Sequence, residues 1–153
     1  KAPRWFAPIQ ASMLELVVVW AWHAPALHHA ARHDAAALVA EQGMFFAAGL
    51  FLWLSAFGGD DAAAGKRSAA GVVGLLLTAM HMTLLGALLA LSPRPLYAHL
   101  NEYTMELGAI TPLDDQHLGG AIMLTVGAVV YLAGGLWLTL RLLRRPALAL
   151  RRS

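Results

Sequence analysis

The sequence predicts an all-α integral membrane protein, a four-transmembrane-helix bundle with both termini cytoplasmic. Hydrophobic residues make up 59% of the chain and charged residues only 13%, which is far from the balance of a soluble domain. Four apolar runs each approach the roughly 20 residues that a membrane-spanning helix needs. We therefore expect residues 1–153 to form a single membrane domain, with approximate spans at 5–22, 36–57, 71–91 and 118–140.

The first run, Trp5–Trp22, leads into Trp22-His23-Ala24-Pro25. Proline disfavours the helical conformation in the residue before it, so this helix should end or kink there. The run lacks a small-residue cleavage site, which predicts a span and not a cleaved signal. Glu15 falls at about mid-depth, where an ionisable group is costly. It is either a proton or ion contact or, as we favour, a neutral carboxyl hydrogen-bonded to a neighbouring helix.

The second helix has Asp34 as a suitable N-cap. The third contains Met80-His81-Met82 near its middle. Successive helical residues are about 100° apart, so the two methionines should point to nearly opposite faces. A mid-membrane histidine needs a partner. We expect His81 to contact a metal ion or to hydrogen-bond Thr78 or Glu15.

The fourth helix should begin near the surface, because Thr111-Pro112-Leu113-Asp114 reads as a capping box with proline at the first helical position. Asp115, Gln116 and His117 then lie in its first two turns. A glycine recurs every seven residues farther along, which predicts a narrow groove for close approach of a neighbouring helix. These glycines are Gly120, Gly127 and Gly134.

The basic residues set the expected orientation, since loops on the cytoplasmic side carry an excess of lysine and arginine. Four spans place nine of them on one side: Lys1, Arg4, Lys66, Arg67, Arg141, Arg144, Arg145, Arg151 and Arg152. Only Arg32 and Arg94 fall on the other side. Both termini are thus predicted to be cytoplasmic, with the basic tail suited to anionic inner-leaflet lipid. An odd helix count, with one re-entrant run, is the alternative.

The outer end collects most of the histidines under this topology, with His81 below them in the membrane. They are His23, His28, His29, His33, His99 and His117. Acidic residues also outnumber basic ones there, although the chain is formally +2, and such a rim attracts cations. The absence of cysteine excludes disulfides, thiolate metal sites and iron–sulfur clusters. Imidazole and thioether donors without thiolate suit copper.

We take His23, His81 and His117 as candidate metal contacts, with Asp115 in support. His23 and His117 would approach each other if the first and fourth helices are neighbours. His29 and His33 are four apart, so on a helix they would share a face and could chelate one ion. The remaining histidines, His28, His33 and His99, are interpreted as solvated surface residues, and Asp114 as a helix cap.

Four motifs appear in a characteristic order. They are Trp22-His23-x-Pro25, Phe45-Phe46-x-x-Gly49-Leu50-x-x-Trp53, Leu85-Gly86-Ala87-Leu88-Leu89 with Pro95-Leu96-Tyr97, and Leu113-x-Asp115-Gln116-x-x-Gly119-Gly120. Together they resemble the CtaG family of bacterial cytochrome c oxidase assembly proteins over nearly the whole chain.

This resemblance implies a multi-pass protein of the bacterial plasma membrane that helps haem–copper oxidases mature, by copper delivery or insertion at the outer face. The family's histidine falls on His23, and its Asp-Gln pair on Asp115 and Gln116. Members of the family are generally longer, and their second helix often carries Glu-His where this chain has Glu41-Gln42.

Two other functions stay open at this stage. One is a structural accessory subunit of a respiratory complex without metal transfer, and the other is a haem b-binding subunit that uses His81. Expected partners are haem–copper oxidase subunits and the lipid bilayer, with no nucleic acid and with homo-oligomerisation left open. No enzymatic turnover is expected.

Overall fold

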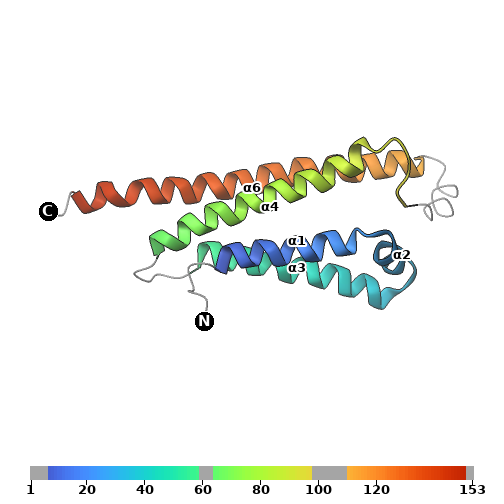
Figure 1. Cartoon of the computed structure of the whole chain (residues 1–153), viewed down its shortest axis with the longest axis horizontal. Helices are drawn as coiled ribbons and strands as arrows, with labels where there is room; N and C mark the ends of the chain where they lie inside the picture. Colours follow the sequence, from blue (N-terminus) through green and yellow to red (C-terminus); the bar gives the residue numbers. More distant parts are fainter. Residues whose placement is uncertain (1–6, 59–63, 98–109, 151–153) are drawn as a thin grey trace.

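The computed structural model describes residues 7–58, 64–97 and 110–150, and only the backbone of 64 and 145–150. These residues form the helices α1 (Ala7–Trp22), α2 (Pro25–His33), α3 (Ala35–Phe57), α4 (Ala64–Leu91) and α6 (Pro112–Leu150). The four longer helices lie lengthwise with alternating direction, and α2 closes one end, the α2 end (Figure 1). The all-α prediction is confirmed for the described residues.

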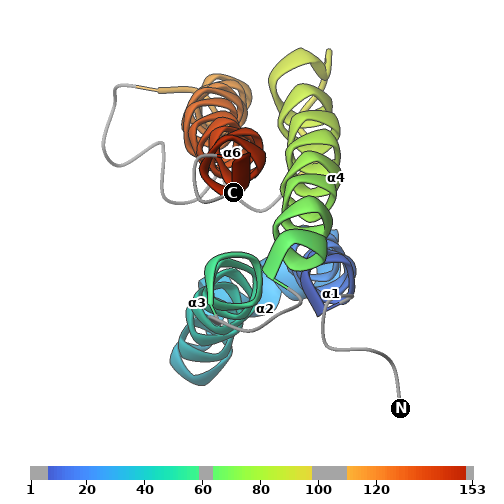
Figure 2. The ribbon, with the colours of Figure 1, turned by 90° about the vertical axis from the view of Figure 1, so that its left-hand side faces the viewer.

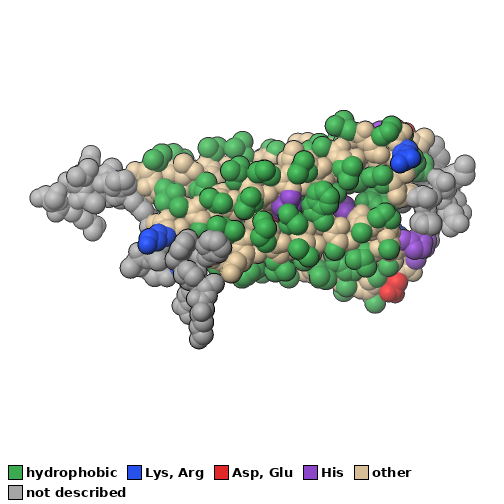
Figure 3. Space-filling model, viewed as in Figure 1, with side chains coloured by type: hydrophobic (Ala, Val, Ile, Leu, Met, Phe, Trp, Pro, Cys, Tyr) green, Lys and Arg blue, Asp and Glu red, His purple; other side chains and the backbone are tan. Residues whose placement is uncertain are grey.

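Three of these helices are long and apolar enough to cross a membrane: Ala35–Phe57, Gly65–Leu91 and Pro112–Arg144. The described part of α1 has 16 residues, fewer than the roughly 20 of a full span, so a fourth crossing remains a prediction. Apolar side chains cover the length of the molecule (Figure 3). Val39 and Phe46 are each 71% exposed. An apolar surface of this extent marks a membrane or partner contact, which supports a multi-pass membrane protein.

The helix starts follow the predicted capping signals. The Asp34 carboxylate accepts the backbone N–H groups of Ala36 and Ala37, each at 3.2 Å. At the start of α6, the Asp114 backbone N–H donates to Thr111 Oγ1 at 3.1 Å. Pro25 is the first residue of α2, where its missing N–H costs nothing. The break after α1 was predicted, but α2 as a helix of its own was not.

Two helices extend beyond their predicted spans. α4 begins at Ala64, ahead of the predicted span at 71–91. α6 begins at Pro112, as the capping box predicted, and runs to Leu150, past the predicted span at 118–140. Hydropathy detects only the bilayer portion of a helix, whereas backbone hydrogen bonding continues into the polar flanks. The basic segment after Arg141 therefore continues α6 as far as Leu150.

The glycine groove predicted on α6 receives α4 at Gly120. A Cβ atom added there would lie 2.6 Å from Ala90 N and 2.8 Å from Gly86 O, so the two backbones touch. An added Cβ at Gly134 would lie 2.7 Å from the Trp53 ring of α3, whereas Gly127 has its nearest neighbour at 3.9 Å. At Gly43 of α3, by contrast, nothing in the described chain lies within 4 Å of an added Cβ.

The buried core divides into two parts. Far from the α2 end, all four long helices meet in one cluster, formed by Ala11, Leu52, Ala56, Leu75 and Leu138. Nearer α2, a second cluster joins only α1, α2 and α3, through Val18, Trp22, Ala31 and Ala48. Figure 2 shows α4 and α6 on one side of the bundle and α1 and α3 on the other. Packing is thus complete at one end and leaves α6 apart from α1 and α3 at the other.

Gly120→Ala should destabilise the protein by about 1–3 kcal/mol, the usual effect of overpacking, because the α4 backbone has to move. Gly135→Ala is the matched control, since an added Cβ there meets nothing within 4 Å. Alanine also favours helix by up to about 1 kcal/mol, so the control should be neutral or stabilising. Unfolding of detergent-solubilised protein measures both. Equal stability of the two variants would contradict the contact.

Candidate functional site

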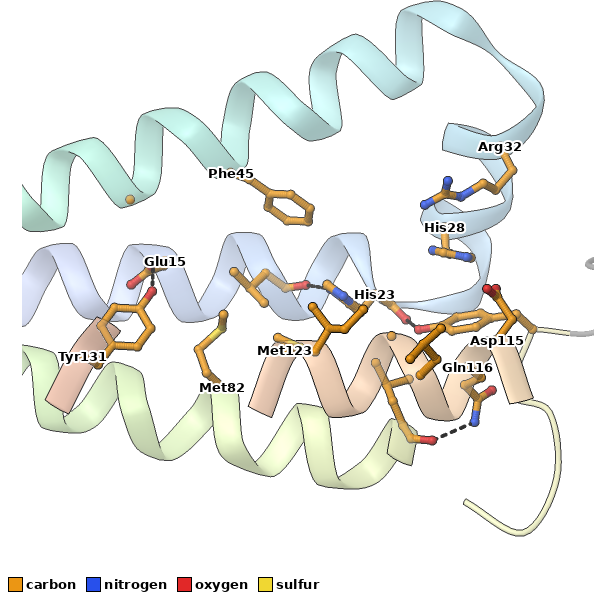
Figure 4. Close-up of a pocket in the computed structure, with 17 residues that line it drawn as sticks. Glu15, His23, His28, Arg32, Phe45, Met82, Asp115, Gln116, Met123 and Tyr131 are labelled. Carbon is orange, nitrogen blue, oxygen red and sulfur yellow. Dashed lines mark hydrogen bonds between the residues drawn. The ribbon is translucent and has the colours of Figure 1, made fainter. Parts of the chain in front are cut away.

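A cavity of about 680 Å³ lies between the helices at the α2 end. Its mouth is lined by His28, Arg32, Asp115 and Gln116, and its base by Glu15 and Tyr131 (Figure 4). His23, Met82 and Met123 lie between the mouth and the base. Val19, Phe45, Leu118 and Ile122 supply apolar wall. The cavity therefore combines imidazole, thioether and carboxyl groups within one largely apolar space.

His23 has its ring fixed by the end of α1. Its Nδ1 lies 2.7 Å from the carbonyl oxygen of Val19. A carbonyl can only accept, so Nδ1 carries the proton and Nε2 keeps a lone pair. Metal-binding histidines in proteins are commonly oriented by this kind of bond to a backbone carbonyl. His23 thus offers the cavity an oriented imidazole ring.

His28 is partly buried and stacks on Tyr97, with ring centroids 4.0 Å apart. Burial, with smaller contributions from Arg32 and His23, lowers the pKa of His28 from 6.5 to about 4. His28 lies at the rim as expected, but it is only partly solvated, because Tyr97 stacks on its ring. Tyr97 is held there by its hydroxyl, which donates to the His23 carbonyl oxygen at 3.0 Å. His28 is accordingly neutral at pH 7 and able to bind a cation.

Asp115 and Gln116 have separate roles. Asp115 is exposed in the first turn of α6 and brings its carboxylate to the mouth. Gln116 is only 5% exposed. Its Oε1 accepts the Leu96 N–H at 2.7 Å, and its Nε2 donates to the Leu89 carbonyl at 3.1 Å. Gln116 thus joins α6 to the end of α4 and to the segment that carries Tyr97.

His117 and His81 do not line the cavity. His117 Nε2 lies 2.9 Å from the Ser92 carbonyl, just beyond α4, and the structure does not bring His117 to His23. His81 is 4% exposed, and neither ring nitrogen has a hydrogen-bond partner among the described residues. The predicted alternative of a bond from His81 to Thr78 or Glu15 is therefore wrong.

Of the four candidate metal contacts, the structure brings together His23 and Asp115. No three His, Asp or Glu side chains in the described ranges are grouped to hold a metal ion. Outside the cavity, His29 and His33 share one face of α2 as expected, with ring centroids 4.1 Å apart. His99 lies outside the described residues.

Met80 and Met82 point to different surroundings, as the helical spacing predicted. Met80 is 56% exposed on the outside of α4, whereas Met82 lines the cavity. Sequence reasoning missed Met123 and Tyr131, which line it from α6. Their signal is a four-residue spacing, Gly119, Met123, Gly127 and Tyr131, which places these residues along one helix face.

The base of the cavity is a hydrogen-bond network on Glu15. Thr78 Oγ1 donates to Glu15 Oε2 at 3.0 Å, and Tyr131 Oη donates to Glu15 Oε1 at 2.9 Å. Ser12 Oγ lies 2.8 Å from Thr78 Oγ1. The single Thr78 hydroxyl proton goes to Glu15, so Ser12 is the donor to Thr78. This network confirms a hydrogen-bonded Glu15 and joins α1 to α4 and α6.

The fold and the cavity define a multi-pass helical membrane protein with a ligand-sized, largely apolar cavity between its helices. The family model described as cytochrome c oxidase caa3 assembly factor (Caa3_CtaG) matches residues 3–145. The chain belongs to this family of oxidase assembly factors, as its motifs indicated. The comparisons with curated proteins and with solved structures found no match.

Acidification should destabilise the protein through His28. The native pKa of about 4 lies below the ordinary 6.5, so between these values the unfolded chain binds a proton that the native state does not. The contribution of His28 to the free energy of unfolding is complete above pH 6.5, falls as the pH drops and levels off below about 4. His28→Phe keeps an aromatic ring against Tyr97 and removes the titration.

Melting temperatures measured across this range in detergent should fall less for His28→Phe than for the wild type. A parallel decline in the two proteins would contradict the burial of a neutral His28.

Proposed function

We propose that this chain helps a haem–copper oxidase to mature by holding copper transiently in the cavity at the α2 end. Family membership supplies the oxidase-assembly role, and the donor set supports the metal. Thioether groups select Cu(I), and imidazole binds copper as well. The single observation that carries the proposal is the oriented His23, whose free Nε2 shares a cavity with two methionines.

The cavity suits temporary binding better than storage. His23, Met82 and Met123 supply imidazole and thioether donors, while Asp115 at the mouth attracts the ion from solution. With no group of three His, Asp or Glu side chains among the described residues, the ion has few ligands and leaves readily to a stronger site on the client. His81 and His117 remain predicted contacts that this arrangement does not bring to the cavity.

The proposed topology has four crossings, with α1 as the fourth span and both termini in the cytoplasm. The alternating helix directions place Lys66 and Arg67, which flank the start of α4, at the end opposite α2 (Figure 1). Arg32 lies at the α2 end, where histidines also gather (Figures 1 and 3). By the positive-inside rule, the cavity then opens to the outer face of a bacterial plasma membrane. The role is delivery to oxidase subunits, without catalytic turnover.

Anaerobic titration of the purified protein with Cu(I), against a competing chelator, tests the proposal. Met82→Leu should weaken binding at least about tenfold, a loss that even outer-shell substitutions cause at metal sites. Met80→Leu makes the same chemical change on the exposed face of α4 and should bind as the wild type does. His23→Ala should lower the affinity at least as much as Met82→Leu.

Stoichiometric binding that survives the combined change His23→Ala, His81→Ala and His117→Ala would refute these histidines as copper ligands. A metal-free protein that co-purifies with mature oxidase in fixed stoichiometry would instead identify an accessory subunit. A Soret band in the absorption spectrum would identify a haem-binding subunit.

A further inference from the structure

We propose that Glu15 is an ion–proton exchange site at the base of the cavity. Its carboxyl group holds a proton while the cavity is empty and releases it when a cuprous ion reaches the base. This inference rests on the proposed function and adds to it a second ion-binding site at the base of the cavity. It concerns a residue to which neither the family motifs nor the candidate metal contacts assign a role.

The hydrogen-bond directions favour a negative charge on Glu15. Each carboxyl oxygen accepts one hydroxyl proton, from Thr78 on α4 and from Tyr131 on α6. Ser12 completes the set by donating to Thr78. Two hydroxyl groups thus donate to one carboxyl group and a third supports Thr78 from behind. Hydrogen bonding to the charged form of a carboxyl group favours that form.

The low polarity of its surroundings disfavours a negative charge on Glu15. Glu15 is 5% exposed, and an unpaired carboxylate within a bilayer is costly. Among the described residues that line the cavity, the one arginine, Arg32, lies at the opposite, mouth end (Figure 4). The negative charge of the carboxyl group is therefore neutralised only when the group carries a proton or a bound cation. A site built to stabilise an anion, without a protein cation beside it, favours exchange of one for the other.

A cation that enters the mouth can reach this group. Glu15 lines the cavity together with Gly49 of α3, whose added Cβ would lie 3.9 Å from Glu15 Oε1. Met82 lies between the mouth and Glu15 (Figure 4) and offers the soft thioether that selects Cu(I). The carboxyl oxygen and the methionine sulfur are the proposed ligands at the base.

The exchange conserves charge and involves no electron transfer. The O–H bond of the Glu15 carboxyl group breaks, a Cu(I)–oxygen bond forms, and the proton leaves through the cavity mouth to water. One positive charge replaces another, so the net charge in the low-dielectric interior stays constant. Entry of the ion without proton release would leave an added positive charge there, which is unfavourable.

The other titratable or charged groups of the cavity come from α1, α2, α6 and the segment after α4. They are His23, His28, Arg32, Tyr97, Asp115 and Tyr131, of which Tyr131 contacts Glu15 directly. The described lining residues of α3 and α4 carry no ionisable side chain. His28, with a pKa of about 4, has no proton to release at neutral pH. Protons released at neutral pH therefore do not come from His28.

The test measures protons and copper together at neutral pH in a weakly buffered, anaerobic solution of the full chain. The Cu(I) titration is followed with a pH-sensitive dye and by infrared spectroscopy of the carboxylic-acid C=O band. Glu15→Gln keeps the shape of the protonated side chain, with an amide N–H₂ in place of the acid O–H, but cannot exchange a proton. Glu41→Gln is the matched control, because Glu41 is a second buried carboxyl group, 3% exposed, which does not line the cavity.

The wild type and Glu41→Gln should release one more proton for each bound copper than Glu15→Gln does. Both should also lose a carboxylic-acid band that Glu15→Gln lacks from the start. Copper binding with equal proton release in all three proteins, or with an unchanged band, would overturn the exchange at Glu15 and leave the proposed function standing. No copper binding to the wild type would overturn both.

Discussion

A carboxyl group within a bilayer must obtain its hydrogen bonds from protein, because the hydrocarbon region holds no water to supply them. Glu15 obtains them from Thr78 and Tyr131, and this requirement fixes α1 against α4 and α6 at one level of the bundle. The same bonds close the cavity at its base. The placement of α1 against α4 and α6 and the depth of the cavity therefore depend on one buried carboxyl group. We propose that this same group exchanges a proton for a cation.

On either side of Glu15 the bundle is built differently. Toward the end opposite α2, glycine and alanine allow the helices to approach closely. A Cβ atom added at Gly71 of α4 would lie only 3.3 Å from the Ala56 side chain of α3. Toward α2, α4 and α6 still pack closely at Gly120, but polar contacts from Gln116 and Tyr97 join the other segments around an open space. A rigid end and an open end suit a protein that accepts and releases an ion without remodelling its fold.

Features set by local sequence were predictable, and features set by distant partners were not. The Asp34 cap and the break at Pro25 depend on backbone geometry within a few residues, so the sequence alone identified them. The burial of His28 depends on Tyr97, and Tyr131 reaches Glu15 across 116 residues. No short pattern encodes such pairings. Family resemblance located His23 and Asp115, but only the structure shows that they share a cavity which His117 and His81 do not line.

The most direct test of this account asks whether the cavity is open to water from outside the cell. The chain has no cysteine, so a single cysteine can report on one position. Met123→Cys, which lines the cavity, should react in intact cells with a small, charged, membrane-impermeant thiol reagent. Val129→Cys, on the apolar surface of the same helix with 64% exposure, should not react. Protection of Met123→Cys, or its reaction only after the cytoplasmic side is opened, would contradict the account.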